Sequence, residues 1–290
     1  MPELPEVETA ARDLAAQVIG RQIVAIEKLD WERMIETPTP AEFHALLPGR
    51  QIVAVGRRAK WLLLTLDAGW TLAIHLRMSG SVSVHPPDMP ADVYTHLVLR
   101  LDDERRIFFH DTRKFGRVRL LDAAGLVLLD QRHGPEPLSE TFTEEVLAAL
   151  LRGRRAQLKP LLLNQAVLAG LGNIYVDESL WRARLHPLRL AASLTQREIA
   201  ALYEAIRTVL TQAVQNKGST LRDYRTGYGQ SGENQHYFMV YGKTNVGQPC
   251  SRCGTAIVRL VVGQRGTHIC PQCQQIYAGS TEPSGLDSPA

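Results

Sequence analysis

The second and third residues of the chain have side chains that could carry covalent chemistry. Pro2 follows Met1, and a residue this small in second place favours removal of the initial methionine. The proline nitrogen is then a free secondary amine, which attacks an aldehyde-like carbon to form a positively charged iminium. An α-amino group has a pKa about two units below that of lysine, so more of it is unprotonated at neutral pH. Glu3 can act beside it as proton donor or acceptor.

A helix is expected directly after this pair. Pro5 suits the first helical turn, and Glu6 suits its positive end. Apolar residues recur at helical spacing as far as Val18, and Gly20 is a typical stop. Pro2 therefore lies just ahead of a helix N-terminus, whose dipole disfavours a protonated amine. The alternative is that the prolines only mark the start of the helix.

Length and composition are those of an ordinary globular chain. The 290 residues suffice for two domains, and a hydrophobic content of 44% supports their cores. A formal net charge of +3 argues only weakly for nucleic-acid binding. Arginine far outnumbers lysine, which suits phosphate binding but also follows from a GC-rich genome. No long apolar run or signal peptide is present, so we expect a cytoplasmic chain without a membrane span.

All the cysteines of the chain lie in two pairs near its end: Cys250 and Cys253, then Cys270 and Cys273. In a cytosolic protein, two Cys-x-x-Cys pairs at this separation indicate one tetrahedral zinc ion rather than disulfides. The alternative, two redox pairs, lacks the surrounding β-α-β pattern that such pairs need.

The middle of the chain changes from strand-like to helical patterns. Short apolar or alternating runs predict strands at 23–27, 52–55, 61–66, 71–76, 81–84, 97–101, 107–110 and 117–121. These eight strands indicate a two-layer β-sandwich, interrupted by a helix at 40–47. Caps and periodicity predict later helices at 144–151, 158–168, 174–184 and 196–216.

The pattern as a whole predicts an α+β chain of several domains. Its expected parts are a catalytic β-sandwich domain over 1–132, a linker at 133–138, a helical domain over 139–236, a zinc finger over 237–276 and a disordered tail at 277–290. Residues 218–237, rich in glycine, tyrosine and arginine, are expected to form a loop within the helical domain.

Two glycine-containing turns could contact an anion. The turn at 169–173 exposes backbone amides ahead of a helix that Asn173 can cap, although such turns usually serve packing alone. Residues 263–266 suggest the turn of a β-hairpin, with Arg265 at its tip. A protruding arginine suits a phosphate or a DNA groove, and equally it is an ordinary exposed turn residue.

Two loops between strands combine a large apolar residue with polar and glycine neighbours. The loop at 75–80 carries Met78, and the loop at 111–116 carries Arg113 and Phe115. Apolar wedges can unstack base pairs, and an arginine can fill the space of an extruded base, although such apolar residues usually belong to a core. Lys60 follows a basic turn and suits a phosphate contact, proton transfer or simple solvation.

Taken in order, these motifs resemble the formamidopyrimidine-DNA glycosylases, bacterial base-excision enzymes for oxidised purines. The resemblance runs from residue 2 to about 275. It rests on PELPEVE at 2–8, RRAKWL at 57–62, HLRMSG at 75–80, GLGNIYVDESL at 170–180 and the four-cysteine hairpin. It implies a helix–two-turn–helix in the helical domain, one structural zinc ion, and damaged double-stranded DNA as the partner of a monomeric enzyme in the bacterial cytosol.

The resemblance also implies the roles of individual residues. Pro2 attacks C1′ of the damaged nucleoside, Glu3 is its acid/base partner, and β,δ-elimination then cuts the strand as an AP lyase. Lys60 and Arg265 match phosphate contacts and elimination steps. The residues that match the intercalating trio are Met78, Arg113 and Phe115. The residues that match DNA-backbone contacts are Arg155, Lys159, Asn173 and, by spacing alone, Tyr94.

The chain departs from the family pattern in three places, one of which is Lys217-Gly218, where the family commonly has a glycine pair. Tyr94 stands where the family has a histidine, and His96 follows two residues later. The loop at 218–237 is a few residues long for the family, so lesion preference is open. Endonuclease VIII, which removes oxidised pyrimidines, is an alternative that Leu4, the trio and this loop disfavour. A catalytically silent damage-binding protein is a second alternative, and it has no need of Pro2, Glu3 or Lys60.

Overall fold

The computed structural model describes residues 2–221 and 224–276, so the tail expected over 277–290 lies outside the described residues. The described chain forms two compact units, each built from separate segments. Of the described residues, the first unit contains 2–139, 165–172, 208–221 and 224–237, and the second contains 140–164, 173–207 and 238–276. The segments of each unit are not consecutive along the chain, and the division into consecutive domains stays a prediction.

The first helix, α1 (Leu4–Val18), begins at a reciprocal cap. Glu3 is the N-cap, and Glu3 and Glu6 form a capping box in which each side chain accepts the other residue's backbone N–H. The helix ends at Val18, and Gly20 follows with a φ of 84°, which glycine adopts without steric cost. The expected helix is confirmed, and its apolar face packs into the core of the first unit.

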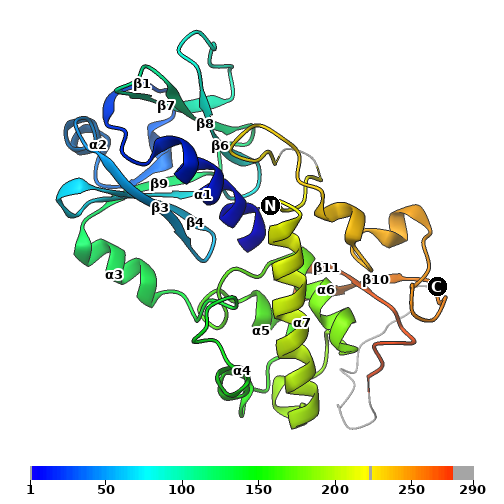
Figure 1. Cartoon of the computed structure of the whole chain (residues 1–290). Helices are drawn as coiled ribbons and strands as arrows, with labels where there is room; N and C mark the ends of the chain where they lie inside the picture. The colour runs from blue at the N-terminus through cyan, green and yellow to red at the C-terminus, as the bar shows by residue number, and fades with distance from the viewer. Residues whose placement is uncertain (1, 222–223, 277–290) are drawn as a thin grey trace. The chain divides into compact units, whose positions relative to one another are not determined.

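Nine strands of the first unit form two sheets (Figure 1). The sheet orders are β1-β7-β8-β6 and β2-β9-β5-β4-β3. The strands are β1 (Ile23–Leu29), β2 (Ile35–Thr37), β3 (Ile52–Arg58), β4 (Trp61–Leu66), β5 (Thr71–His75), β6 (Gly80–His85), β7 (Thr95–Leu101), β8 (Arg106–Asp111) and β9 (Arg117–Leu121). The eight expected strands are confirmed. The sequence missed β2 because its three residues are too few to show alternation.

Apolar residues of both sheets and of α1 form one continuous core. It includes Val7 of α1, Leu72 and Val118 of the five-stranded sheet, and Leu99 and Phe109 of the four-stranded sheet, all of them buried. The alternation of apolar residues along each strand places these side chains between the layers. The sandwich therefore holds α1, and with it the N-terminal residues, on a rigid support.

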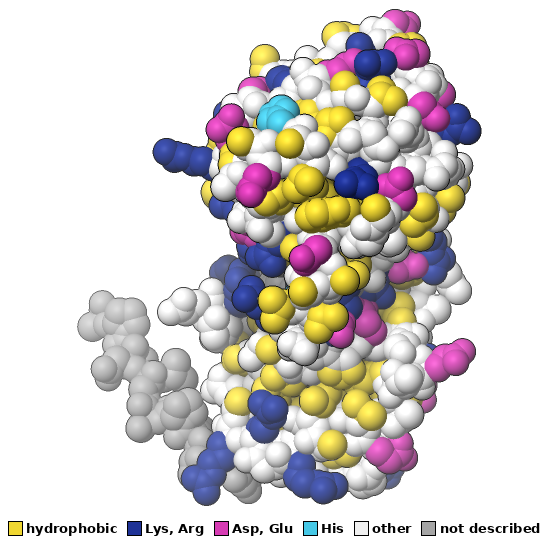
Figure 2. All heavy atoms as spheres, turned by 90° about the vertical axis from the view of Figure 1, so that its left-hand side faces the viewer, with side chains coloured by type: hydrophobic (Ala, Val, Ile, Leu, Met, Phe, Trp, Pro, Cys, Tyr) yellow, Lys and Arg dark blue, Asp and Glu magenta, His cyan; other side chains and the backbone are white. Residues whose placement is uncertain are grey.

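Two further helices belong to the first unit. Thr39 and Glu42 cap α2 (Pro40–Leu46), which the sequence predicts, whereas α3 (Ala123–Gln131) was not expected. The apolar residues of α3 do not keep to one face, since Val127 and Leu128 remain exposed, so no helical period stands out. Figure 2 shows acidic, basic and apolar side chains interspersed on one side of the molecule.

The stretch at 133–138, expected as a linker, is tied to the first unit by Glu136. Its carboxylate pairs with Arg57 and Arg58 and accepts a hydrogen bond from the backbone N–H of Ala59 at 2.6 Å. Burial acts to raise the pKa of Glu136, but the two guanidinium groups outweigh it and the pKa is lowered. The carboxylate therefore stays ionised and holds the turn between β3 and β4.

Four helices follow along the chain: α4 (Glu144–Leu151), α5 (Leu158–Leu163), α6 (Asn173–Ala183) and α7 (Gln196–Gln215). The hydroxyl of Thr143 caps α4 by accepting a hydrogen bond from the backbone N–H of Val146. Thr195 and Glu198 form the expected reciprocal bonds ahead of α7. Short 3₁₀ turns lie at Glu32–Met34, Asp67–Gly69, Ala191–Ser193, Asn234–Tyr237 and Lys243–Val246.

The helix expected over 158–168 is wrong beyond Leu163. The backbone after it bonds to the 133–138 stretch instead, because Gly134 N donates to Gln165 O at 2.8 Å and Ala169 N donates to Pro135 O at 3.1 Å. A helix through these residues would leave both bonds unmade. Val167 and Leu168 lie in a loop but are still buried. The apolar spacing in the sequence therefore continues past the end of α5 although the helix does not.

The last two strands, β10 (Val258–Val262) and β11 (Arg265–Ile269), form a hairpin. Val262 pairs with Arg265, so the turn consists of Gly263 and Gln264 alone, both with positive φ as in a type I′ turn. Arg265 therefore begins the return strand and is not the tip residue that the sequence predicted. Within the described ranges, no helix is long and apolar enough to cross a membrane.

Candidate active site

The carboxylate of Glu3 is buried and held by a glycine turn. Its Oε2 accepts a hydrogen bond from the backbone N–H of Gly172 at 2.7 Å. The next residue, Leu4, donates its backbone N–H to Gly170 O at 3.0 Å. The turn at 169–173 therefore lies against the start of α1, and the amide of Gly172 is used by Glu3. This contact agrees with the alternative that the turn serves packing, and it leaves the amide of Gly172 engaged by Glu3.

Glycine is required at both positions by the closeness of this contact. A Cβ on Gly172 would lie 2.3 Å from Cδ of Glu3, and a Cβ on Gly170 would lie 2.6 Å from Cδ1 of Leu4. Gly170 also has a φ of 84°. The sequence showed the glycines but could not show what approaches them, since their partners are about 170 residues away along the chain.

Pro2, the residue before this contact, is buried. Glu6 is a further buried acid, hydrogen-bonded to Glu3, and the sequence analysis treated it only as a helix-start residue. Glu6 accepts from the backbone N–H groups of Glu3 at 2.8 Å and of Ser219 at 2.7 Å. Its spacing of three from Glu3, the capping-box signature, was the signal that could have singled it out.

Lys60 lies in the turn between β3 and β4 and is buried, directly after Ala59, whose φ is 52°. Its charge acts on His75, a residue that the sequence analysis did not select. Burial, and after it the positive charges of Arg77 and Lys60, lower the pKa of His75 to about 3. His75 is therefore neutral at physiological pH, and its Nδ1 accepts from the backbone N–H of Arg77 at 3.0 Å.

The expected trio Met78, Arg113 and Phe115 lies at the surface of the first unit. The side chains of Met78 and Phe115 are 41% and 48% exposed, which excludes the alternative that they belong to a core. The Nε of Arg113 donates to the hydroxyl of Ser79, the neighbour of Met78, at 3.4 Å. The two loops that carry the trio are thus in contact.

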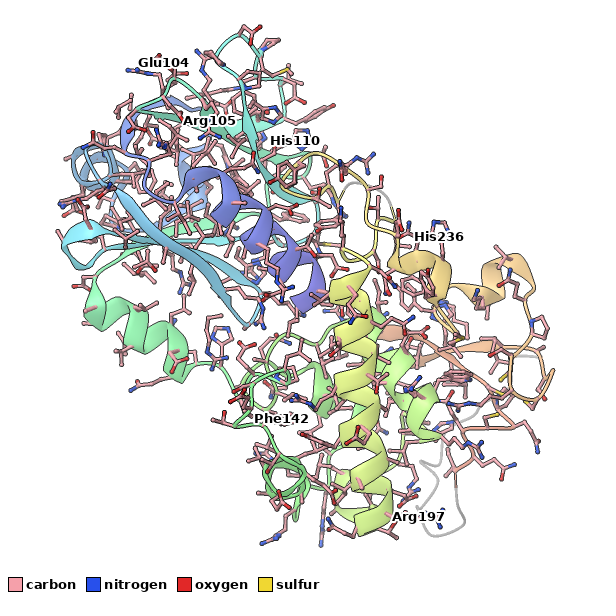
Figure 3. All side chains as sticks on the ribbon, viewed as in Figure 1. Glu104, Arg105, His110, Phe142, Arg197 and His236 are labelled. Atoms are coloured by element: carbon pink, nitrogen blue, oxygen red, sulfur yellow. The ribbon has the colours of Figure 1, made fainter. Side chains whose placement is uncertain are left out.

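The two candidates for a DNA contact at the start of β7, Tyr94 and His96, differ in exposure. Tyr94 is 47% exposed and its ring lies edge-on to His110, with 5.8 Å between centroids. His110, labelled in Figure 3, also pairs with Asp92 at 3.2 Å. His96 is buried between Asp30 Oδ1 at 2.7 Å and a backbone carbonyl. Of the two residues, Tyr94 alone offers a side chain to the surface.

Lys159 does not reach the surface, which corrects its expected contact with the DNA backbone. Its side chain is fully buried and its Nζ lies 2.6 Å from Asp177 Oδ1 in a salt bridge. The same ammonium donates to Gly266 O, in the hairpin, at 3.1 Å. Asp177 also accepts from the backbone N–H of His268 at 2.9 Å. Lys159 therefore anchors the hairpin to α5 and α6.

The other expected residues of the second unit are positioned as follows. Asn173 begins α6 and donates its side-chain N–H to Gly266 O at 2.9 Å. Arg155 is exposed in the loop before α5. Arg265 is exposed next to Gly266, at the start of β11. Asn173 and Arg265 are thus brought to the same hairpin, which Asn173 helps to hold.

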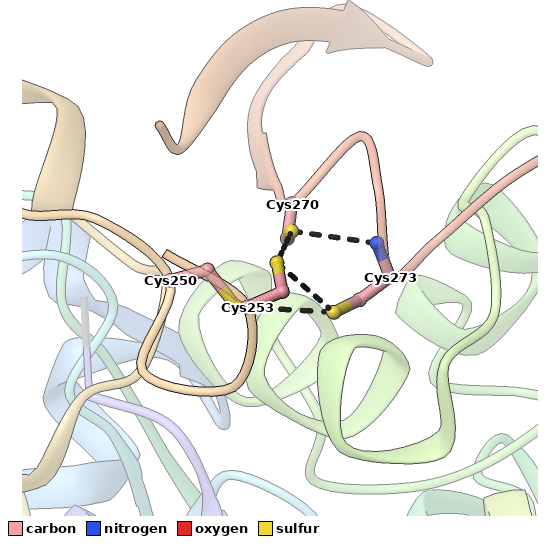
Figure 4. Close-up of side chains that lie close together, drawn as sticks. All are labelled: Cys250, Cys253, Cys270 and Cys273. Atoms are coloured by element: carbon pink, nitrogen blue, oxygen red, sulfur yellow. Dashed lines mark hydrogen bonds between the residues drawn. The ribbon is translucent and has the colours of Figure 1, made fainter. Parts of the chain in front are cut away.

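The four cysteines converge at the other end of the hairpin (Figure 4). Their sulfur atoms all lie within 4.8 Å of one another, with separations of 3.4, 3.6 and 3.9 Å among three of the pairs. Tetrahedral zinc with Zn–S bonds of about 2.3 Å requires sulfur atoms about 3.8 Å apart. The donor set therefore fits one zinc ion with no position left for water.

The cysteine module is fixed to α6 by two side chains. Glu178 is buried and accepts the backbone N–H groups of Met239, Val240 and Tyr241 at 2.8 to 3.0 Å. Arg252, between the first two cysteines, donates to Trp181 O at 2.7 Å and lies 3.8 Å above its ring centroid. The sequence analysis missed both residues because neither belongs to a metal-binding pattern.

Comparison with protein families accounts for most of the chain. The models that match are the formamidopyrimidine-DNA glycosylase N-terminal domain over residues 1–118, the formamidopyrimidine-DNA glycosylase H2TH domain over 133–225 and the zinc finger found in FPG and IleRS over 247–276. The fold, the four-cysteine site and these matches define a DNA glycosylase with one structural zinc ion.

Comparison with individual relatives shows which family of DNA glycosylases the chain resembles. The chain is 62% identical over 275 residues to the formamidopyrimidine-DNA glycosylase of Roseiflexus sp. (strain RS-1), covering 95% of this chain and 100% of the relative. It is 60% identical to that of Chloroflexus aggregans, covering 94% and 98%. A solved complex of a Lactococcus lactis FPG mutant with Fapy-dG DNA has a TM-score of 0.88 at 38% identity, covering 95% and 100%.

The chain therefore belongs to the formamidopyrimidine-DNA glycosylase family, as its resemblance implied. It is a DNA glycosylase of base excision repair.

Proposed function

We propose that this glycosylase removes oxidised purines, 8-oxoguanine and formamidopyrimidines, from duplex DNA and then cuts the strand. The observation that carries the proposal is the contact of Glu3 and Leu4 with the glycine turn at 170–172, which fixes the residues around Pro2. Solved relatives support the substrate class. They hold DNA with Fapy-dG, an abasic site or carbocyclic 8-oxo-G.

The first step is attack by the Pro2 nitrogen, once Met1 has been removed. Its lone pair forms a bond to C1′ while the bond from C1′ to the base breaks, and the base leaves with that electron pair and a proton. The sugar ring then opens, so that O4′ gains a proton, the nitrogen loses one and an iminium remains. Glu3, held beside Pro2 by Gly172, is the group that moves this proton.

The iminium makes strand cutting possible. It withdraws electrons from C2′, so loss of the C2′ proton breaks the C3′–O bond and releases one phosphate. Loss of the C4′ proton then breaks the C5′–O bond and releases the second. Lys60 and Arg265 are the proposed phosphate contacts, because a cation beside a leaving phosphate stabilises its charge.

The remaining residues of the proposal bind DNA. Arg155 and Asn173, from the second unit, and Tyr94, from the first, contact the sugar–phosphate backbone. Met78, Arg113 and Phe115 enter the duplex and fill the space that the extruded base leaves, since exposed apolar side chains and an arginine suit that role. We place the enzyme in the cytoplasm and expect it to act as a monomer. Light scattering in the presence and absence of DNA tests the monomeric state.

Borohydride trapping tests the nucleophile. Borohydride reduces an iminium to a stable amine, so enzyme mixed with DNA containing 8-oxoguanine opposite cytosine becomes covalently joined to it. Pro2→Gly keeps an amine but positions it loosely, so trapping continues more slowly. A tag fused ahead of Pro2 turns the amine into an amide, which eliminates trapping while lesion binding remains. Equal trapping by the tagged protein overturns the proposal and points to Lys60.

A second substrate separates the alternatives. Duplexes carrying an oxidised pyrimidine are cut much more slowly than those carrying 8-oxoguanine if the proposal holds. Preference for the pyrimidine favours an activity like that of endonuclease VIII. Binding of both duplexes without cutting or trapping, by protein shown by mass spectrometry to lack Met1, favours a silent binding protein.

A further inference from the structure

The two loops that carry the trio meet at one buried acid. Met78 lies in the loop between β5 and β6, and Arg113 and Phe115 lie in the loop between β8 and β9. Asp111, the last residue of β8, lies below both loops and is fully buried. It also pairs across the sheet with Gly80, the first residue after the Met78 loop.

The carboxylate of Asp111 accepts four hydrogen bonds from the two loops. Its Oδ1 accepts from the hydroxyl of Ser79 at 2.5 Å and from the backbone N–H of Arg113 at 3.2 Å. Its Oδ2 accepts from the backbone N–H groups of Phe115 at 2.8 Å and of Gly116 at 2.7 Å. Each of these donors is neutral and each adjoins or belongs to a residue of the trio. One side chain thus connects both loops.

The position of Asp111 is itself fixed by its surroundings. Its backbone N–H donates to Tyr94 O at 2.8 Å, and Nε2 of buried His96 lies 3.1 Å from its carbonyl oxygen. The loop that carries Arg113 and Phe115 packs closely against β8, because a Cβ on Gly116 would lie 2.3 Å from Cζ of Phe109. The bases of the loops are therefore packed tightly while the tips remain exposed. A wedge built in this way enters a duplex without first being ordered.

We propose that Asp111 is a positioning residue that holds Met78, Arg113 and Phe115 as one rigid wedge. This inference rests on the proposed role of that trio in duplex DNA. Asp111 touches no substrate. It acts by presenting the three tips in one geometry, so its removal slows those steps that need the wedge and spares those that do not.

Two substitutions weaken this anchor to different degrees. Asp111→Asn keeps the shape but replaces one acceptor oxygen by an N–H₂ group, which then faces backbone N–H donors. Ser79→Ala removes only the link between the loops and is the milder change. Asp122→Asn is the matched control, because Asp122 is an exposed acid of the same unit that accepts one backbone N–H from Gly125 at 2.8 Å.

The readout compares a reaction that needs the wedge with one that does not. Excision of 8-oxoguanine from a duplex requires the space of the extruded base to be filled. Borohydride trapping at an abasic site in single-stranded DNA does not, because no base pair has to be opened. Asp111→Asn slows the first by about tenfold, the usual effect of losing a charged hydrogen bond. Trapping changes little, although the melting temperature falls because buried N–H donors lose an acceptor, and Ser79→Ala has an intermediate effect on duplex excision.

A double-mutant cycle shows whether Asp111 acts through the wedge. If it does, the double variant Asp111→Asn, Phe115→Ala cuts the duplex at most about twofold more slowly than Phe115→Ala alone. The reason is that the effects of coupled residues do not add. Effects that multiply, or an equal slowing of duplex cutting and single-strand trapping, overturn the inference.

The same variants separate this inference from the function on which it rests. If Met78→Ala and Phe115→Ala slow duplex excision but Asp111→Asn does not, only the positioning role is wrong. If Met78→Ala and Phe115→Ala leave duplex excision unchanged, the proposed wedge itself is wrong, and the inference is overturned with it.

Discussion

Some positions of the first unit accept only one type of residue, because neighbouring atoms leave no space for a larger one. Gly172 approaches Glu3 so closely that no side chain fits between them, and the backbone N–H of Gly172 is the hydrogen-bond donor to the carboxylate. The carboxylate of Glu3 and the backbone N–H of Gly172 therefore act together. Each is unremarkable without the other, since glutamate is common at helix starts and glycine is common in turns.

We therefore predict that Gly172→Ala is severely damaging to activity. The added Cβ forces the turn away from Glu3, and a displacement of about 1 Å at a reacting group can reduce the rate about 100-fold. The measurement is the single-turnover rate of strand cutting at 8-oxoguanine. Gly56→Ala, in β3, is the control, because no atom lies within 4 Å of a Cβ placed there. Activity of Gly172→Ala within threefold of the unaltered protein contradicts the prediction.

A second prediction at this scale concerns His75 and acid stability. The pKa of His75 is lowered to about 3 in the folded protein by burial and by Arg77 and Lys60. Since the unfolded chain takes up the proton first, the stability that depends on neutral His75 is present above about pH 6.5 and is lost as the pH falls toward 3. Between about pH 7 and pH 5 this loss amounts to about 2 kcal/mol.

His75→Gln removes that loss, so its stability falls less between the same two pH values. Urea unfolding of the first unit, followed by hydrogen exchange at each pH, measures the difference. His44→Gln, at an exposed position of α2, is the control and leaves the pH dependence as it was. An unchanged slope in His75→Gln means that the histidine is not held neutral.

At the scale of elements, the β10–β11 hairpin depends on helices that precede it by about a hundred residues. Lys159 of α5 and Asn173 of α6 both donate to the carbonyl oxygen of Gly266, and Asp177 of α6 accepts from the backbone of β11. Arg265 adjoins the residue that receives these bonds. The position of its backbone is therefore set by α5 and α6 as well as by the turn.

We predict that Lys159→Met destabilises the second unit by about 3 kcal/mol or more, because it leaves Asp177 buried without its cation. DNA affinity falls as well, since the hairpin that carries Arg265 loses its anchor. Hydrogen exchange over β10 and β11 and a DNA titration are the measurements. Lys243→Met, on a half-buried lysine that bonds to Gln248, is the control. Lower affinity with unchanged stability and a reduced salt dependence indicates a phosphate contact instead.

At the scale of the whole molecule, each compact unit has its own source of stability. The first has the sandwich core, whereas the cluster around Trp181 and Val240 in the second includes the ligand residues Cys250 and Cys270. A small cluster of this kind is completed by its metal, because zinc binding contributes folding free energy directly. The two units therefore respond differently to loss of zinc.

We predict that chelation of zinc, or Cys250→Ala, unfolds the hairpin and cysteine segment while the sandwich stays folded. Protection from hydrogen exchange is lost over 247–276 and kept over the strands of the first unit. DNA binding is lost together with it. Ser251→Ala, a change beside the first ligand that removes no ligand, is the control and retains zinc. Retained protection over 247–276 in the metal-free protein contradicts the prediction.

The sequence by itself determined the features that depend on local spacing. Pro5, the helical spacing of apolar residues and Gly20 defined α1, short apolar or alternating runs defined eight strands, and Cys-x-x-Cys spacing defined the zinc ligands. Each of these follows from neighbours a few residues apart, where the geometry of a helix, strand or turn is fixed. Motifs of this kind in a fixed order were also sufficient for the resemblance to a family.

Only the tertiary structure decided which groups meet across long stretches of chain. The amides of the turn at 169–173 suggested an anion site, but Gly172 donates to Glu3 instead. Lys159 was a plausible phosphate ligand until its pairing with Asp177 removed it from the surface, and the loops of Met78 and Phe115 meet at Asp111. A buried polar group must find a partner, and which partner it finds depends on the packing of distant segments, about which local spacing carries no information.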